Sequence, residues 1–188
     1  MRPSKREELV RKALDVFYRG GFHATGMDMI VEETGISKTA IYNHFRTKDD
    51  LILAVLRRRD EVFRNWLFKR MAELGATEAD QLVTMFDALG EWFSEPSFKG
   101  CMFIKAVAEF QDPDHPAFKH SVEHKALIEK HLLILARKSD LQDPETLVKR
   151  LLILKEGAII AAQFRSIQKP AEEAKATARL LIAAAKPH

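Results

Sequence analysis

Signals that start a helix recur along this chain and constrain its fold more than any other feature. A serine or threonine followed three positions later by an acidic residue occurs at Ser4–Glu7, Thr25–Asp28, Thr47–Asp50 and Thr77–Asp80. This is the pattern of a capping box, in which both side chains accept hydrogen bonds from backbone N–H groups that the first helical turn leaves unpaired. Apolar residues at helical spacing follow each of the four patterns, so each of them predicts a helix.

Proline and glycine residues indicate further helix starts and helix ends. Further helix starts are predicted at the segment Pro113–Pro116, at Pro144 and at Pro170, because the fixed φ of proline suits a first helical turn. Gly20–Gly21 and Gly35 predict helix ends. Strict period-two alternation and Asn-Gly hairpin signals are absent from the sequence. We therefore predict an all-α protein of about nine helices with no sheet.

Composition excludes several classes of protein. The 188 residues include 30 Lys and Arg against 27 Asp and Glu, and this net charge of +3 is too small to indicate nucleic-acid binding alone. One cysteine excludes an internal disulfide framework and a cysteine-based zinc site. Charged residues interrupt every apolar stretch, and no apolar segment follows the basic residues at the start. We expect a soluble, cytoplasmic protein with no membrane span and no secretory signal.

Residues 25–48 have the organisation of a helix-turn-helix. We predict a helix over about 27–34, a turn at 35–37 and a second helix over about 38–45. Gly35 can take the positive φ that a sharp helix exit requires, and Ser37 can cap the second helix. Apolar residues at Ile30, Ile41 and Phe45 then face inward, where the first predicted helix covers them.

The residues left on the outer side of the second helix suit the major groove of DNA. They are short and polar, and they lie in an interval, 36–48, that contains no acidic residue; the outward set is Lys38, Thr39, Ala40, Tyr42, Asn43 and His44. Asn43 could pair with adenine through two hydrogen bonds, and Thr39 or Ala40 could contact a thymine methyl group.

Other residues of this segment suit the phosphate backbone. Tyr42, His44 and Lys48 could bind phosphates directly, and Thr25 and Thr47 lie at predicted helix starts, where free N–H groups favour anions. The alternative is an ordinary helical bundle, since two helices joined at a glycine occur in many of them. The outward side chains and the acid-free interval favour DNA.

The same residues resemble a known family. The chain resembles the N-terminal module of the TetR (tetracycline-repressor-type) family at five places: Phe17–Thr25, Ile30, Gly35–Lys38, Ile41–Phe45 and Lys48. The resemblance implies a homodimeric transcriptional repressor that reads a palindromic operator. It also implies a DNA-binding domain over residues 1–47 and an effector-binding and dimerisation domain over 48–188.

The larger domain is rich in aromatic residues and methionines on helical faces. Such stripes more often form core than cavity, but as a group they suggest a small apolar or aromatic effector. Arg59 could meet a carboxylate of that effector. The candidate effector-binding residues are Arg59, Phe63, Trp66, Met85, Phe86, Phe93, Met102, Phe103, Phe110 and His131.

A metal or cofactor is not expected. His120, His124 and His131 share one helical face, and the first two have metal-ligand spacing, but no cysteine completes a ligand set and no Glu-x-x-His pair occurs in the sequence. We interpret this face as solvated or pocket-lining. Cys101 is expected to be a buried small side chain, because the sequence holds no resolving cysteine.

The last two predicted helices have apolar residues at helical spacing and suit an association surface. A pair from each of two subunits would form a four-helix interface, and the alternative is that they pack only within one subunit. The candidate interface residues are Leu151, Leu154, Gly157, Ala158, Ala161, Ala178, Leu181 and Ile182.

Two other functions are the rivals of a ligand-responsive repressor. A small helical enzyme or carrier finds little support, because the sequence has no phosphate-binding glycine loop, no His-Glu-x-x-His and no nucleophile elbow. An architectural DNA-binding protein without an effector would differ by lacking an internal cavity.

Overall fold

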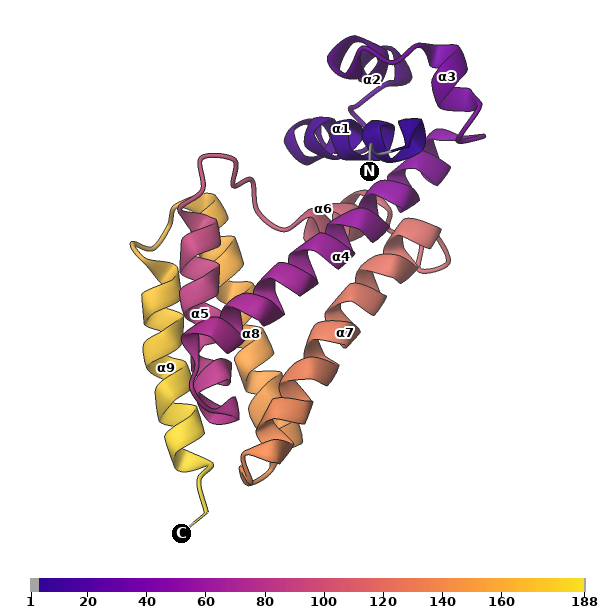
Figure 1. Ribbon diagram of the computed structural model, residues 1–188. Helices are drawn as coiled ribbons and strands as arrows, with labels where there is room; N and C mark the ends of the chain where they lie inside the picture. The colour runs from indigo at the N-terminus through magenta and orange to yellow at the C-terminus, as the bar shows by residue number, and fades with distance from the viewer. Residues whose placement is uncertain (1–3, 188) are drawn as a thin grey trace. The chain divides into compact units, whose positions relative to one another are not determined.

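The computed structural model describes residues 4–187, and within them the chain is all-helical, with nine α-helices and no β-strand (Figure 1). The predicted fold class is confirmed. The helices are α1 (Lys5–Gly20), α2 (Met27–Thr34), α3 (Lys38–Tyr42), α4 (Lys48–Leu74), α5 (Glu78–Phe93), α6 (Met102–Glu109), α7 (Pro116–Lys138), α8 (Pro144–Phe164) and α9 (Pro170–Ala184). Among these described helices, none combines the length and apolar character needed to cross a membrane.

Three of the four predicted capping boxes form. Ser4 and Glu7 exchange hydrogen bonds at the start of α1, as do Thr47 and Asp50 before α4 and Thr77 and Asp80 before α5. In each pair the acidic side chain accepts from the backbone N–H of the capping residue, at 2.7 Å for Ser4, 3.0 Å for Thr47 and 3.1 Å for Thr77. These reciprocal bonds satisfy N–H groups that the helices themselves cannot pair.

The box expected at Thr25–Asp28 is wrong. Helix α2 is capped by Gly26 without a side-chain hydrogen bond. Thr25 precedes the cap by one residue, is fully buried, and its hydroxyl donates to the carbonyl of Gly21 at 2.6 Å instead. The hydroxyl therefore stabilises the turn before α2 rather than the helix itself.

The chain divides into two compact units. The first comprises the residues up to Val62 together with Cys101–His124, and the second comprises Phe63–Gly100 and the residues from Lys125 on. Helices α4 and α7 each contribute residues to both units. The functional division at residue 48 that the resemblance implies stays a prediction.

The first unit holds α1, α2 and α3 around a small apolar core. Phe17 and Phe22 lie at its centre with ring centroids 5.6 Å apart, and Ile30 and Ile41 are buried beside the same core. The ammonium of Lys12 in α1 donates to the carbonyl of Thr34 at 2.7 Å, which joins α1 to the end of α2. Short helices are thus held by shared burial, since helices of this length are marginal alone.

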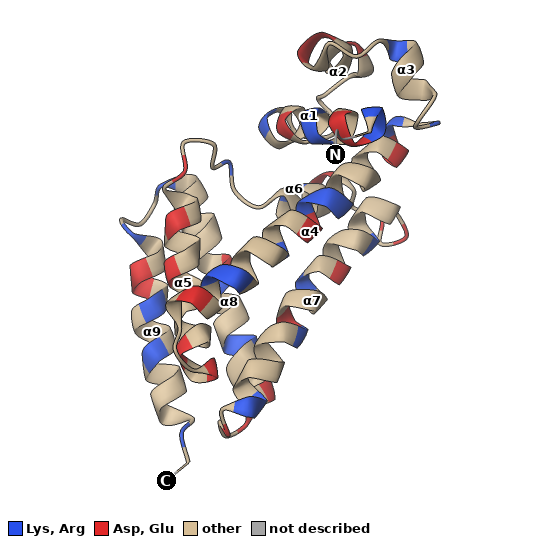
Figure 2. Cartoon of the chain, in the orientation of Figure 1, with Lys and Arg blue, Asp and Glu red and all other residues tan. Residues whose placement is uncertain are grey.

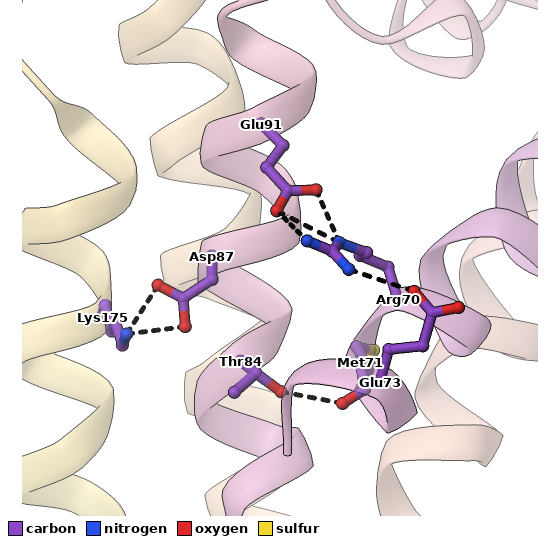
Figure 3. Close-up of polar contacts among 7 residues, drawn as sticks. All are labelled: Arg70, Met71, Glu73, Thr84, Asp87, Glu91 and Lys175. Carbon is purple, nitrogen blue, oxygen red and sulfur yellow. Dashed lines mark hydrogen bonds and ion pairs between the residues drawn. The ribbon is translucent and has the colours of Figure 1, made fainter.

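In the second unit α5, α8 and α9 pack side by side (Figure 1). A Cβ atom on Gly90 of α5 would lie 3.4 Å from that of Ala171 in α9, so these two helices approach closely. Charged residues join the helices around this core (Figure 3). Lys175 of α9 contacts both oxygens of Asp87 in α5 at 2.6 Å, and Arg70 of α4 contacts Glu91 of α5 at 2.7 Å.

The ion pair between Arg70 and Glu91 also shifts the pKa values of both side chains. The hydrogen bonds from Arg70 lower the pKa of the Glu91 carboxyl, and those same bonds to Glu91 and Glu73 raise the pKa of Arg70 above its usual range. Because the groups are solvated, their main effect is to orient side chains rather than to add much stability.

Gly35 gives a test of the turn between α2 and α3. Its φ of 67° is left-handed, whereas Gly26 has a φ of −79°, and a Cβ atom at either glycine would meet nothing within 4 Å. We expect Gly35→Ala to lower the free energy of unfolding by about 1 kcal/mol, because only the backbone conformation is penalised. Urea denaturation measures this, and Gly35→Asn is the matched control, because asparagine tolerates the left-handed conformation and should cost less than alanine. Equal effects of the two substitutions would contradict the explanation.

Candidate DNA-binding site

The turn between α2 and α3 is built as the sequence predicts. The N–H of Gly35 donates to the carbonyl of Val31 at 2.9 Å and closes the end of α2. Ser37 is extended and caps α3, its Oγ accepting from the N–H of Ala40 at 3.3 Å. The glycine and the serine therefore set the direction in which α3 leaves the turn.

Helix α3 has one buried side and one free side. Ile41 is 1% exposed and Phe45, just beyond the helix, is 4% exposed, so both anchor the segment in the core. The predicted outward set is confirmed as outward, with Ala40 half-buried and five residues exposed: Lys38, Thr39, Tyr42, Asn43 and His44. Figure 2 shows α3 without acidic residues and with a basic one at its start.

Helix α3 ends earlier than predicted, at Tyr42 rather than near residue 45. Asn43 keeps helical angles, with φ −66° and ψ −22°, but the N–H groups of His44 and Phe45 both donate to the carbonyl of Ile41. The last turn is thus tightened. Asn43 and His44 still lie on the exposed side, at the end of the segment.

Lys38 is held by an acidic neighbour. Its ammonium lies 2.9 Å from Oδ1 of Asp28 in α2, and this hydrogen bond raises the pKa of Lys38. Both side chains are well exposed, so the pair is weak and Lys38 can exchange Asp28 for a phosphate.

Thr25 and Lys48, two of the predicted phosphate-binding residues, form hydrogen bonds within the module. The hydroxyl of Thr25 is committed to Gly21, as described above. The ammonium of Lys48 donates to the carbonyls of Phe22 and Thr25, at 3.0 and 3.2 Å. Their binding of phosphate stays a prediction, and in this structure both stabilise the turn that precedes α2.

Glu109 of α6 supports this module, although no sequence pattern predicted it. Its carboxylate accepts from the N–H groups of Phe22 and His23, at 2.9 and 2.6 Å, and so holds the loop between α1 and α2. Nearby, Lys105 of α6 donates to the carbonyl of Tyr18 at 2.9 Å. The partners lie 87 positions apart in the sequence, and no local pattern signals such a pairing.

The predicted effector-binding residues fall into both units. The first unit holds Arg59, Met102, Phe103 and Phe110; the second holds Phe63, Trp66, Met85, Phe86, Phe93 and His131. All but Arg59, Trp66, Phe93 and His131 are buried. Their role as effector contacts stays a prediction.

His131 has the most distinctive environment in this set. Its ring stacks on that of Phe68 with centroids 3.7 Å apart, and burial lowers its pKa. Within residues 4–187, nothing forms a hydrogen bond with its buried Nε2. A buried nitrogen without a partner is costly, so this atom is available to a ligand.

His124 is not on a solvated face. It is 1% exposed, its Nδ1 lies 2.7 Å from Oδ1 of buried Asp60, and its ring stacks on Phe103 with centroids 3.7 Å apart. His120 instead pairs with exposed Glu123 at 3.3 Å. Among the described residues, no group of histidines, cysteines and acids is placed to hold a metal ion. Cys101 is buried, as predicted.

The predicted interface residues of α8 and α9 lie mostly on the inner side of these helices. Gly157 is exposed and Leu154 and Leu181 are half-buried, but five are buried within the subunit: Leu151, Ala158, Ala161, Ala178 and Ile182. The large apolar residues that are exposed are instead Ile153 (73%), Phe164 (72%) and Leu180 (72%). Apolar spacing located the helices but selected the side that packs internally.

The three-helix arrangement, with its glycine turn and free polar face on α3, defines a helix-turn-helix DNA-binding module. Residues 9–55 match the family described as bacterial regulatory proteins, tetR family. The HTH-type transcriptional regulator YjdC of Escherichia coli (strain K12) is 22% identical over 155 residues, which are 82% of this chain and 81% of that protein.

Further similarities agree with this match. The HTH-type transcriptional activator FasR of Mycolicibacterium smegmatis is 46% identical over 57 residues, 30% of this chain and 26% of FasR. SCO4454, a TetR-family transcriptional regulator from Streptomyces coelicolor, has a crystal structure that aligns with a TM-score of 0.89 at 25% identity, covering 99% of this chain and 92% of that one. The N-terminal module therefore belongs to the TetR family, and the chain is a DNA-binding transcriptional regulator of the TetR type.

The brace at Glu109 can be tested by amide hydrogen exchange. Hydrogen bonds to a charged acceptor contribute about 1.5–3 kcal/mol, and partial exposure reduces this to about 1 kcal/mol here. We expect Glu109→Gln to speed exchange at the N–H groups of Phe22 and His23 about fivefold. The control Glu33→Gln removes only the exposed pair with Arg19 and should leave those amides unchanged. Unaltered exchange in Glu109→Gln would disprove the brace.

Proposed function

We propose that this regulator is a homodimeric repressor that binds a palindromic operator and is released by a small apolar or aromatic effector. The exposed polar face of α3 carries the proposal, because it presents base-reading side chains on a segment anchored by Ile41 and Phe45. The corresponding functional domains would be residues 1–47 and 48–188, in a cytoplasmic protein.

Base reading would fall to the middle and end of the α3 segment. Asn43 can donate to and accept from adenine in the major groove, and Thr39 and Ala40 can contact a thymine methyl group. Ser37, Lys38, Tyr42 and His44 would contact phosphates, which position the module without selecting sequence. Two such segments, one from each subunit, would read the two half-sites of a palindrome.

Self-association is supported by an exposed apolar face on α8 and α9, which we call the outer face. On α8 it consists of exposed Ile153, Gly157 and Phe164 with half-buried Ile160, and on α9 of exposed Ala176, Leu180 and Ala183. Their spacing of three or four residues places each set on one side of its helix. Large exposed apolar patches usually mark interaction sites, and a second copy is the occupant that a palindromic operator requires.

Release by an effector is supported by the chemistry of the second unit. Phe63 lies in a cluster with Trp66 and Trp92, at centroid distances of 5.6 and 4.9 Å. The free Nε2 of His131 supplies a polar anchor beside the Phe68 ring. An effector releases the operator only if it binds the non-DNA-binding conformation more tightly, since equal affinity for both shifts nothing.

Asn43→Ala tests the base-reading assignment. It should cost about 1–3 kcal/mol of binding at one base position and relax the preference there, because a bidentate contact is lost. Gel-shift titration on fragments selected from a random pool by the unaltered protein measures the change. Asn65→Ala alters an exposed asparagine of α4 outside the module and should bind as the unaltered protein does. Unchanged affinity and base preference in Asn43→Ala would remove the assignment.

Leu180→Asp tests the outer face. Placing a carboxylate in an apolar interface should weaken self-association at least tenfold, since its burial would be unpaired. Leu180 is 72% exposed, so the fold should tolerate the substitution. Sedimentation velocity across a concentration series gives the result. Ile134→Asp, at an exposed residue of α7, is the control. A dimer as stable as the original in Leu180→Asp would show that another surface mediates association.

A further inference from the structure

The second unit carries a groove that no part of the proposed DNA-binding or dimer surface explains. It has a volume of about 770 Å³ and is walled by α5, the end of α8, the link between α8 and α9 and the start of α9. This volume falls in the range of small-molecule sites, about 300–1,000 Å³. Of the predicted effector-binding residues, only Phe86 and Phe93 line it.

The acidic side chains of the groove already have cationic partners. Asp87 pairs with Lys175 at 2.6 Å, and Glu91 pairs with Arg70 at 2.7 Å (Figure 3). Glu172 pairs with Lys169 at 2.9 Å. Each of these carboxylates would have to give up an ion pair to bind a cationic ligand, so the groove does not favour cations.

Arg165 is the charged lining residue that remains available. Within residues 4–187, its guanidinium has no acidic partner, and it is exposed at the groove. Its φ of 54° is left-handed, at a helix-end position where glycine is usual. The helix thus ends on a conformation that disfavours a side chain, and the side chain placed there is a long cation.

Apolar side chains also line part of the groove. Phe93 and Ile167 contribute partly exposed surface, Phe86 is a buried lining residue, and Ala162 is half-buried. The site therefore combines apolar side chains with one positive charge, at Arg165, that has no acidic partner within residues 4–187.

We propose that this groove binds a small organic anion, with a carboxylate or sulfonate at Arg165 and an aromatic or aliphatic body on Phe93 and Ile167. The assignment is independent of the proposed effector release, because it concerns binding in this groove alone. A second copy of the chain is the competing occupant, since Ile167 lies close in sequence to Phe164 of the outer face.

Calorimetric titration with phenylbutyrate and with its neutral analogue phenylbutyramide tests the proposal on the full chain. The acid should bind about fivefold more tightly than the amide, as expected for one partly solvated ion pair. Arg165→Gln should abolish this preference, and Arg165→Lys should retain it. Ala162→Trp should fill the groove and weaken both ligands.

Arg179→Gln is the matched control. Arg179 is an exposed arginine of α9 that lines a different groove and has no ion-pair partner among the described residues. Its removal should leave the preference for the acid intact. The proposal is overturned if neither ligand binds, if the acid binds no better than the amide, or if Arg165→Gln keeps the preference. It is also overturned if Arg165→Gln changes self-association in sedimentation, which would identify a second copy as the occupant.

Discussion

The DNA-binding surface depends on the burial of two side chains. Helix α3 has only five residues, far fewer than the roughly 12–15 that an isolated helix needs to persist in water. Its position is therefore set by Ile41 and Phe45, which are inserted in the core, and by the cap at Ser37. Because these contacts lie on one side, the other side of α3 stays exposed.

The loop that precedes α2 is stabilised by charge rather than by secondary structure. Its carbonyl groups at Phe22 and Thr25 accept from Lys48, and its N–H groups at Phe22 and His23 donate to Glu109. A loop has few backbone partners of its own, and buried backbone groups must be paired. Residues of α4 and α6 thus complete the hydrogen bonding of the DNA-binding module.

Much of this architecture could be predicted from the sequence because it depends on local interactions. Capping boxes, proline starts and the glycine at the α2 turn depend on neighbours within a few residues, and they located the helices and the exposed face of α3. The predicted cap at Thr25 is wrong because its hydroxyl has two possible partners, and tertiary burial selects the carbonyl of Gly21. Glu109 could not be found, because its partners are distant in sequence.

The outer face could not be predicted from the spacing of apolar residues. Helix α8 is apolar on more than one side, and periodicity alone cannot say which side packs against α9. The predicted interface residues Leu151 and Ala158 are buried in the subunit, whereas Ile153 and Phe164 are exposed. Only the arrangement of the neighbouring helices distinguishes the two sides.

The one-sided anchoring of α3 also separates two properties that are often linked. Exchanging Thr39 or Asn43 removes almost no packing, so it costs the fold little. With the proposed base reading by these residues, point mutations would change the recognised DNA sequence while the scaffold keeps its stability, and a duplicated copy of such a gene would acquire a new target without first being rebuilt.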